Sequence, residues 1–197
     1  MIHISKDNKK MGSSVWSISL PPITTCAPKI PCASSCYANR MYRRLKLLRA
    51  AWDDNLRELR SGRKQYFESI RLKLRDSQYA RPRLFRWHVG GDIPDAYYWD
   101  EMRKIALIFE DVKFLVFTKK YRIVGNDNCV IPDNLSVVLS AWPGLKIVNP
   151  LKFPLAFMQD GSEDRISNAV ECYGSCETCG MCWNLQSLGK NVVFYKH

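Results

Sequence analysis

The sequence predicts an α/β protein with an open, partial (β/α) barrel-like parallel sheet and a cysteine-rich C-terminal extension. Short apolar runs typical of buried strands alternate with longer segments in which apolar residues recur every three or four positions. This alternation is the pattern of a parallel α/β sheet. The 197-residue chain is also 46% hydrophobic and 12% aromatic, enough to form a substantial core. We assign residues 1–150 to the α/β core and residues 151–197 to the extension.

Four apolar runs are the predicted strands of the core, and a fifth closes the chain. They are short, rich in β-branched and aromatic residues, and bounded by segments that contain glycine, proline or charged residues. Beyond residue 144 the pattern weakens, and prolines indicate a loop-rich region before the last strand. The predicted strands occupy residues 15–20, 84–89, 112–118, 135–140 and 191–195.

The segments between the strands show helical periodicity. Ser61 and Gly62 mark a break between two helical patterns. Asp95 is a suitable N-cap for the next helix, because its short side chain can accept a hydrogen bond from a free N–H of the first turn. We interpret the apolar stripes of these helices as core contacts rather than ligand contacts. The first stripe consists of Leu45, Leu48, Trp52, Leu56 and Leu59.

Three cysteines, Cys26, Cys32 and Cys36, follow the first predicted strand within eleven positions. A trio of thiolates on a strand-to-helix loop can hold three irons of a [4Fe-4S] cluster and leave the fourth iron open. It can equally supply most of a tetrahedral zinc site. Because the eight cysteines of the chain are clustered rather than scattered, we interpret the trio as metal ligands rather than as unrelated buried thiols.

A second cluster consists of Cys172, Cys176, Cys179 and Cys182. Four thiolates can complete a coordination shell, and the ligand type alone leaves zinc and a [4Fe-4S] cluster both open. The tight run is more typical of ferredoxins than of zinc ribbons, so we expect two [4Fe-4S] clusters, with zinc as the alternative here. The remaining thiol, Cys129, is expected to be a buried small hydrophobe.

Polar or glycine residues stand at the carboxyl ends of the predicted strands. Ligands of parallel α/β sheets collect at these ends, so we expect these residues to lie near the first cysteine trio. Glycine also lets a ligand approach the backbone closely, because it has no Cβ. His88, within a predicted strand, is expected to be a satisfied core histidine rather than a ligand or base. The candidate ligand-binding residues are Gly90, Gly91, Asp92, Thr118 and Ser140.

The formal net charge of +11 is concentrated between residues 40 and 86, where fifteen Lys/Arg stand against five Asp/Glu. A basic surface of this kind is typical of proteins that bind polyanions, and a solvated helix face is the alternative. Arg43, Arg44 and Arg49 are the candidate contacts to DNA or RNA.

The amino-terminal residues 1–10 carry charges where a signal peptide would have an apolar run. No apolar segment approaches the length of a membrane span. We therefore expect a cytoplasmic protein without membrane contact. In a reducing cytosol, clustered cysteines bind metal more often than they form disulfides.

At several of these residues the chain resembles the phage family called gene product 88. The resemblance covers most of the chain and implies a location in the cytoplasm of the host cell, without implying an activity. The matching features are residues 36–38 (Cys-Tyr-Ala), Phe85–His88 leading into Gly91–Ile93, Asn134–Leu135, Cys182–Trp183 and the closing residues 194–197.

The layout is also distantly similar to that of radical S-adenosylmethionine enzymes, which carry three cluster-binding cysteines after the first barrel strand. This similarity implies a [4Fe-4S] cluster on the first trio, and Gly90-Gly91-Asp92 in place of the turn that contacts the methionine amino group. Thr118 and Ser140 would then offer hydroxyls at the mouth of the site. The spacing differs from the usual C-x3-C-x2-C, and Asp92 replaces a glutamate.

Three function classes follow from these features. The first is a minimal radical S-adenosylmethionine-like enzyme that acts on nucleic acid or nucleotides and needs a reductant such as a flavodoxin or ferredoxin. The second is a non-catalytic nucleic-acid-binding protein in which iron–sulfur or zinc centres stabilise the fold. The third is an iron–sulfur electron-transfer module.

Overall fold

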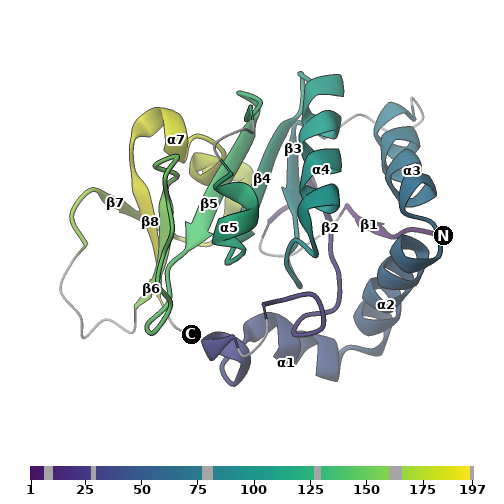
Figure 1. Cartoon of the computed structure of the whole chain (residues 1–197), viewed down its shortest axis with the longest axis horizontal. Coiled ribbons are helices and arrows are strands. Elements are labelled where there is room, and N and C mark those ends of the chain that lie inside the picture. The colour runs from purple at the N-terminus through teal and green to yellow at the C-terminus, as the bar shows by residue number, and fades with distance from the viewer. Residues whose placement is uncertain (7–10, 28–29, 77–81, 127–129, 160–165, 196–197) are drawn as a thin grey trace.

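The computed structural model describes residues 1–6, 11–27, 30–76, 82–126, 130–159 and 166–195. These residues form one sheet with the strand order β1-β2-β3-β4-β5-β6-β8-β7 (Figure 1). The first pair is antiparallel and every other neighbouring pair is parallel. The sheet does not close on itself, since β1 and β7 stand at its two edges. The predicted open α/β fold is confirmed.

The strands predicted from the apolar runs are all present, in part with shorter ends. The β5 and β8 strands have the predicted bounds, whereas β2 and β3 each end two residues earlier than predicted. The strands are β1 (Ile4–Ser5), β2 (Val15–Ile18), β3 (Leu84–Trp87), β4 (Lys113–Thr118), β5 (Leu135–Ser140), β6 (Leu155–Gln159), β7 (Ala169–Glu171) and β8 (Asn191–Tyr195).

The helices begin and end where local chemistry dictates. Gly62 separates α2 from α3, as predicted. The side chain of Asp95 accepts from the backbone N–H of Tyr98 at 3.0 Å and so caps α4, as predicted. The helices are η1 (Pro31–Ala33), α1 (Tyr37–Arg44), α2 (Lys46–Ser61), α3 (Arg63–Arg75), α4 (Ala96–Ile108), α5 (Tyr121–Val124), α6 (Cys176–Cys179), η2 (Met181–Trp183) and α7 (Leu185–Leu188).

One face of the sheet carries the larger core, which packs against the long helices. Alternate strand residues such as Phe85, Trp87 and Phe114 are fully buried there beside Tyr98 of α4. Burying a side chain of this size contributes roughly 2–3 kcal/mol relative to leaving it exposed. Leu45 of the predicted apolar stripe is not in this core: it lies between α1 and α2 and is 43% exposed.

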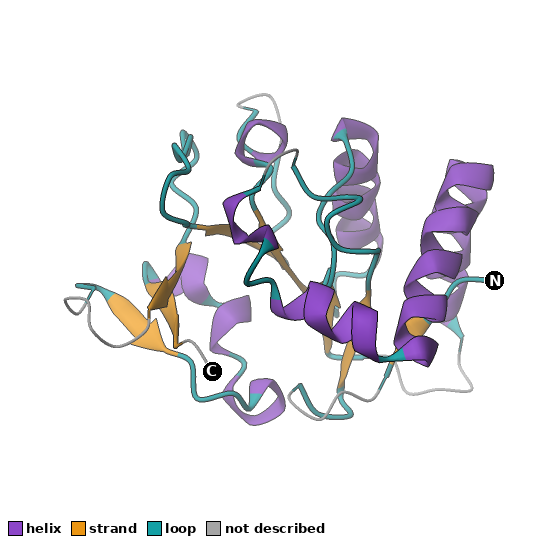
Figure 2. Cartoon of the chain, turned by 90° about the horizontal axis from the view of Figure 1, so that it is seen from below, coloured by secondary structure: helices purple, strands orange, loops and turns teal. Residues whose placement is uncertain are grey.

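The opposite face of the sheet packs against the cysteine-rich segment. Val15, Leu115 and Val138 contribute the intervening strand residues, and Trp183 and Leu185 cover them. The indole N–H of Trp183 donates to the carbonyl of Phe85 at 3.2 Å, which ties the segment to β3. Figure 2 shows long helices on one side of the strands and short helices on the other.

The loop-rich region predicted beyond residue 144 also contains β6 and β7. The β6 strand was missed because Pro154 precedes it directly, and a proline normally signals a break; at the start of a strand it does not interrupt the ladder. The segment after residue 150 therefore adds three strands to the same sheet. Within the described residues, none of the helices has the length and apolar character needed to span a membrane.

Candidate metal centres and their surroundings

The first cysteine trio lies on the connection between β2 and α1, at the carboxyl edge of the parallel strands (Figure 1). Cys32 is in η1, and Cys36 is the N-cap of α1, where its Sγ accepts from the backbone N–H of Asn39 at 3.4 Å. Cys26 follows the loop after β2. All three side chains are half-buried free thiols.

Two charged residues, Asp92 and Lys119, affect the pKa values of the trio. Burial, together with the nearby Asp92, Cys36 and Cys32, raises the pKa of Cys26 to about 11, although a backbone hydrogen bond from Ile23 opposes the rise. Burial also raises the pKa of Cys32, whereas the ammonium group of Lys119 lowers it. A hydrogen bond places Asp92 at the trio's loop, because its backbone N–H donates to the hydroxyl of Thr25, next to Cys26, at 3.2 Å. The sequence expectation that the trio and residue 92 share one edge of the sheet is met.

The thiols do not form a ready-made ion site in this conformation. Among the described residues, no three Cys, His, Asp or Glu side chains are grouped so that they could hold a metal ion.

The Gly90-Gly91 turn follows β3 and packs against the first part of the chain. A Cβ on Gly90 would lie 2.2 Å from the Trp52 ring, and one on Gly91 would lie 2.7 Å from the carbonyl oxygen of Leu20. Gly91 also has φ +80°, a conformation that only glycine adopts readily. The groups that approach these glycines are the chain's own, Trp52 at Gly90 and Leu20 at Gly91, and the predicted approach of a ligand stays a prediction.

Asp92 is 4% exposed and holds the ends of β3 and β4 together. One carboxylate oxygen accepts from the N–H of Ile93 at 2.7 Å and from the hydroxyl of Thr118 at 2.6 Å. The other accepts from the N–H of Lys119 at 2.9 Å. Burial raises the pKa of Asp92, and these three donors oppose the rise. The Thr118 hydroxyl is itself buried and also accepts from the N–H of Lys120, so it does not face an open mouth.

His88 stands between β3 and the glycine turn, with φ +58°. The ring is buried, as predicted, but neither ring nitrogen has a hydrogen-bond partner among the described residues. The expectation of a satisfied histidine is therefore wrong: the ring packs against the aromatic side chains of Trp87 and Tyr98 instead. Burial, followed by the charge of Arg86, lowers the pKa of His88 to about 3.

The second cysteine cluster lies on the opposite face of the sheet, and among the described residues its thiols, too, are not grouped so that three of them could hold a metal ion. Cys172 directly follows β7, Cys176 and Cys179 bound α6, and Cys182 lies in η2. Burial and the other three thiols together raise the pKa of Cys182 to about 12, while the charge of Arg86 opposes the rise. Three of the four thiols pack among the apolar side chains of that face. The four predicted ligands therefore lie in one neighbourhood.

Arg86 is the functional candidate that the sequence reasoning missed. Its guanidinium lies 5.0 Å from the Phe117 ring, and its Nε is buried without a hydrogen-bond partner. Within the described part of the chain, no carboxylate forms an ion pair with Arg86. Its charge instead acts on Cys172, Cys176 and Cys182, while burial lowers its pKa. Arg86 lies on the half-buried face of β3, between the fully buried Phe85 and Trp87.

Comparison with models of protein families matches residues 3–142 to the family described as Gene product 88. The chain belongs to the gene product 88 family. The matched region contains the first cysteine trio, the glycine turn and Asp92, and it ends before the second cysteine cluster. No match was found among the curated proteins or the solved structures.

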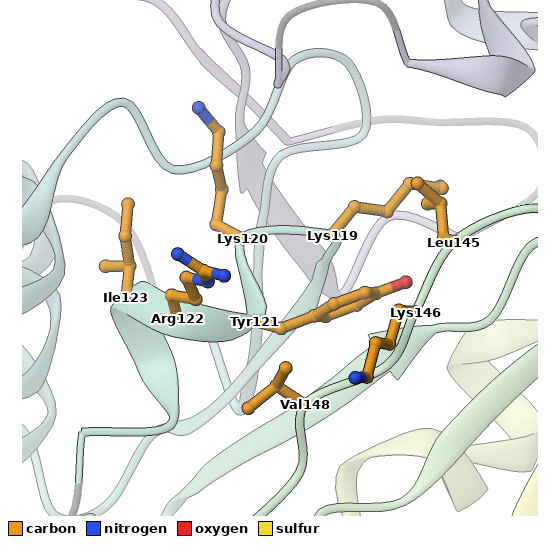
Figure 3. Close-up of a pocket in the computed structure, with 8 residues that line it drawn as sticks. All are labelled: Lys119, Lys120, Tyr121, Arg122, Ile123, Leu145, Lys146 and Val148. Carbon is orange, nitrogen blue, oxygen red and sulfur yellow. The ribbon is translucent and has the colours of Figure 1, made fainter.

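In this gene product 88 protein, the rim beside the first trio continues into a pocket of about 320 Å³ that the sequence did not predict (Figure 3). Tyr121 forms part of its wall, and the Tyr121 hydroxyl donates to the Ser140 carbonyl at 2.5 Å. The backbone of Ser140, rather than its hydroxyl, is therefore the group with a defined role here. The lining residues are Lys119, Lys120, Tyr121, Arg122, Ile123, Leu145, Lys146 and Val148.

The candidate nucleic-acid contacts lie on the helices that follow the first trio. Arg43 and Arg44 are exposed in the last turn of α1, and Arg49 is exposed on α2. The α1 helix has no buried residue, although it starts directly at Cys36. Its arginines are therefore free of core packing and stand within about two turns of the first trio.

Proposed function

We propose that this protein is an iron–sulfur enzyme of the radical S-adenosylmethionine-like type, with a [4Fe-4S] cluster bound by Cys26, Cys32 and Cys36. One observation carries the proposal: three thiols lie on the connection that leaves the carboxyl edge of an open parallel sheet, and a pocket lies at the same edge. In parallel α/β proteins this edge is the usual place for ligands. A purely structural metal site has no need of that position.

The three cysteines would bind three irons, and a nearby cation would balance the negative charge of their thiolates. The Lys119 ammonium is close enough to lower the pKa of Cys32, so it favours the thiolate form that ligates metal. Asp92 would fix the turn beside the trio, because its oxygens accept hydrogen bonds from the backbone N–H groups of Ile93 and Lys119. When bound and reduced, such a cluster supplies the electron that cleaves S-adenosylmethionine. The electron would come from a flavodoxin- or ferredoxin-like reductant.

We propose a second [4Fe-4S] cluster on Cys172, Cys176, Cys179 and Cys182, with zinc as the alternative metal. The surroundings of this site suit an anionic centre, because Arg86 brings a buried positive charge to it. The site lies under Trp183 on the face of the sheet away from the long helices. This second centre would support the fold or carry electrons rather than bind S-adenosylmethionine.

The test is anaerobic reconstitution followed by iron, sulfide and zinc analysis. We expect about eight irons per chain, four per cysteine-bound cubane. Cys32→Ser and Cys182→Ser should each lose about half of the iron, and Cys129→Ser, which changes the thiol outside both clusters, should lose none. Stoichiometric zinc without sulfide would contradict the proposal.

The enzyme assignment needs its own measurement on the reconstituted protein. S-adenosylmethionine should change the electron paramagnetic resonance spectrum of the reduced cluster, and 5′-deoxyadenosine should form under reducing conditions. Cys32→Ser should abolish both effects, while Cys182→Ser should leave the spectral change in place. If both clusters are intact and the spectrum ignores S-adenosylmethionine, the enzyme assignment fails and the electron-transfer function remains.

A second candidate function, metal-stabilised nucleic-acid binding without catalysis, is favoured by the exposed arginines of α1 and α2. If they contact phosphates, the logarithm of the affinity for single-stranded DNA should fall linearly with the logarithm of the salt concentration. Changing Arg43, Arg44 and Arg49 together to alanine should flatten that slope by about 2. An unchanged slope would leave these arginines as a solvated helix face.

A further inference from the structure

The pocket at the rim is lined by cations and contains no acidic side chain. Lys119, Lys120, Arg122 and Lys146 line this pocket of about 320 Å³, and their charged ends are spread around Tyr121 rather than pointing to one spot, with Lys120 directed away from the Tyr121 ring (Figure 3). They come from two separate segments, the start of α5 and the loop after β5. Four like charges around one pocket favour an anion there, since an anion reduces their mutual repulsion.

These four cations lack the ion pairs that other cations of the chain form. Arg63 pairs with Asp95, and Lys104 pairs with both Asp100 and Glu101. By contrast, none of the four pocket cations is within salt-bridge distance of a carboxylate in the described ranges of the chain. Lys119 instead lies 5.7 Å from the Trp142 ring, a contact that leaves its hydrogen-bond donors free.

We propose that this pocket binds a phosphate group, carried by a nucleotide or by a nucleic-acid strand. A single carboxylate would use one or two of the four cations. A terminal phosphate has up to two negative charges and three acceptor oxygens, so it can engage lysine ammonium groups and an arginine fork together, and neighbouring phosphodiesters of a strand can share the four cations. Tyr121 remains a neutral wall of the pocket, because burial raises its pKa to about 12.

The pocket and the first cysteine trio are linked through Asp92, which accepts from the N–H of Lys119 and donates its own N–H to the hydroxyl of Thr25, the residue before Cys26. Lys119 lines the pocket and also acts electrostatically on Cys32. Tyr121 lines it too, and its pKa responds to Asp92 and to Cys32. A phosphate held here would therefore anchor a substrate whose reacting part reaches the trio. That last step rests on the proposed function, whereas phosphate binding itself does not.

Binding is measured on the full-length protein with a short fluorescein-labelled single-stranded oligonucleotide and with a competing nucleoside monophosphate. The double variant Lys120→Gln/Lys146→Gln should lose at least about tenfold in affinity, and its salt slope should fall by about 1.4, or 0.7 per phosphate contact removed. The matched control, Lys73→Gln/Lys190→Gln, removes the same charge from the end of α3 and from the residue before β8. It should stay within about twofold of the wild type.

The two phosphate sources separate in the same experiment. Competition by the monophosphate, weakened in the pocket variant, would assign the site to nucleotides. Pocket-dependent binding of the strand alone would assign it to nucleic acid. Equal losses of affinity in the pocket and control variants would mean that the oligonucleotide responds to the net charge of the protein rather than to the pocket. That outcome would overturn the proposal, and so would an absence of binding.

The iron–sulfur proposal and the phosphate-site proposal can be refuted independently of each other. Cys32→Ser, which should lose the first cluster, should keep the pocket-dependent binding, because the four cations are unchanged. If binding holds and the iron is absent, the proposed enzyme is wrong and the phosphate site stands. If both clusters are intact and the pocket variant binds like the control variant, the phosphate site is wrong and the iron–sulfur assignment stands.

Discussion

Replacing Asp92 by asparagine removes one charge and one hydrogen-bond acceptor from the point where β3 and β4 end. The wild-type carboxylate accepts from the backbone N–H groups of Ile93 and Lys119 and from the Thr118 hydroxyl. Asparagine has the same shape but only one acceptor oxygen. If that oxygen keeps the Ile93 and Thr118 bonds, the amide NH₂ group faces the Lys119 N–H, and two donors oppose each other.

The size of the effect follows from these contacts. A buried donor left without an acceptor costs about 1–3 kcal/mol. Burial raises the pKa of Asp92 despite its three donors, so removing the charge recovers part of its desolvation penalty. We therefore expect Asp92→Asn to lower the free energy of unfolding by about 2 kcal/mol, and Asp92→Ala, which strands all three donors, by about 3 kcal/mol.

Urea unfolding of the metal-free protein measures this difference. Asp133→Asn is the matched control, because Asp133 is exposed and should change the free energy of unfolding by less than about 0.5 kcal/mol. If Asp92 served only to receive a ligand, neutralising its buried charge would leave the metal-free protein unchanged or more stable. That result would refute the assignment of Asp92 to the strand junction.

Two further substitutions probe the buried polar groups near β3. Lowering the pH from 6.5 towards 3 should destabilise the metal-free wild type, because unfolded His88 binds a proton that the buried ring, with its pKa lowered to about 3, does not. Protonation of this one histidine in the unfolded chain should lower the free energy of unfolding by about 2 kcal/mol at pH 5. The variant His88→Asn, in which asparagine tolerates the positive φ, should lose this part of the pH dependence in urea titrations. Arg86→Met should leave the metal-free fold as stable or more so, since it removes a buried Nε without a partner, yet it should weaken metal retention at the second cysteine cluster in chelator competition. Arg83→Met, at an exposed position before the same strand, should change neither property.

Strand positions and helix breaks were predictable because each rests on local chemistry. The apolar run at residues 135–140 has one reading, a buried strand, and β5 has those bounds. Asp95 caps α4 through its own side chain, so no distant contact is needed to place the helix start. The shared edge of the first trio and Asp92 followed from the βαβ connection, which puts the carboxyl ends of parallel strands together.

The roles of individual polar residues were not predictable in the same way. Whether Asp92 faces a ligand or a backbone N–H depends on the β3–β4 pairing register, which sequence spacing does not encode. The left-handed φ of His88, likewise, depends on how the turn packs rather than on the residue. The pocket was missed because its cations come from residues 119–122 and 146, which no sequence motif connects.

The two cysteine clusters differ in how their charge is balanced, and the difference follows from the sheet. Arg86 sits inside β3 with its side chain on the face covered by the second cluster, so its charge stays with those thiols. Lys119 follows β4 at the rim, where its charge acts on Cys32 while its side chain lines the open pocket. An anion in that pocket would draw on the same ammonium group that favours the Cys32 thiolate. A cluster on the first trio, if it forms as proposed, would therefore act on the pocket through Lys119 alone and leave the other three cations to bind the anion, whereas the second cysteine cluster lies on the other face of the sheet.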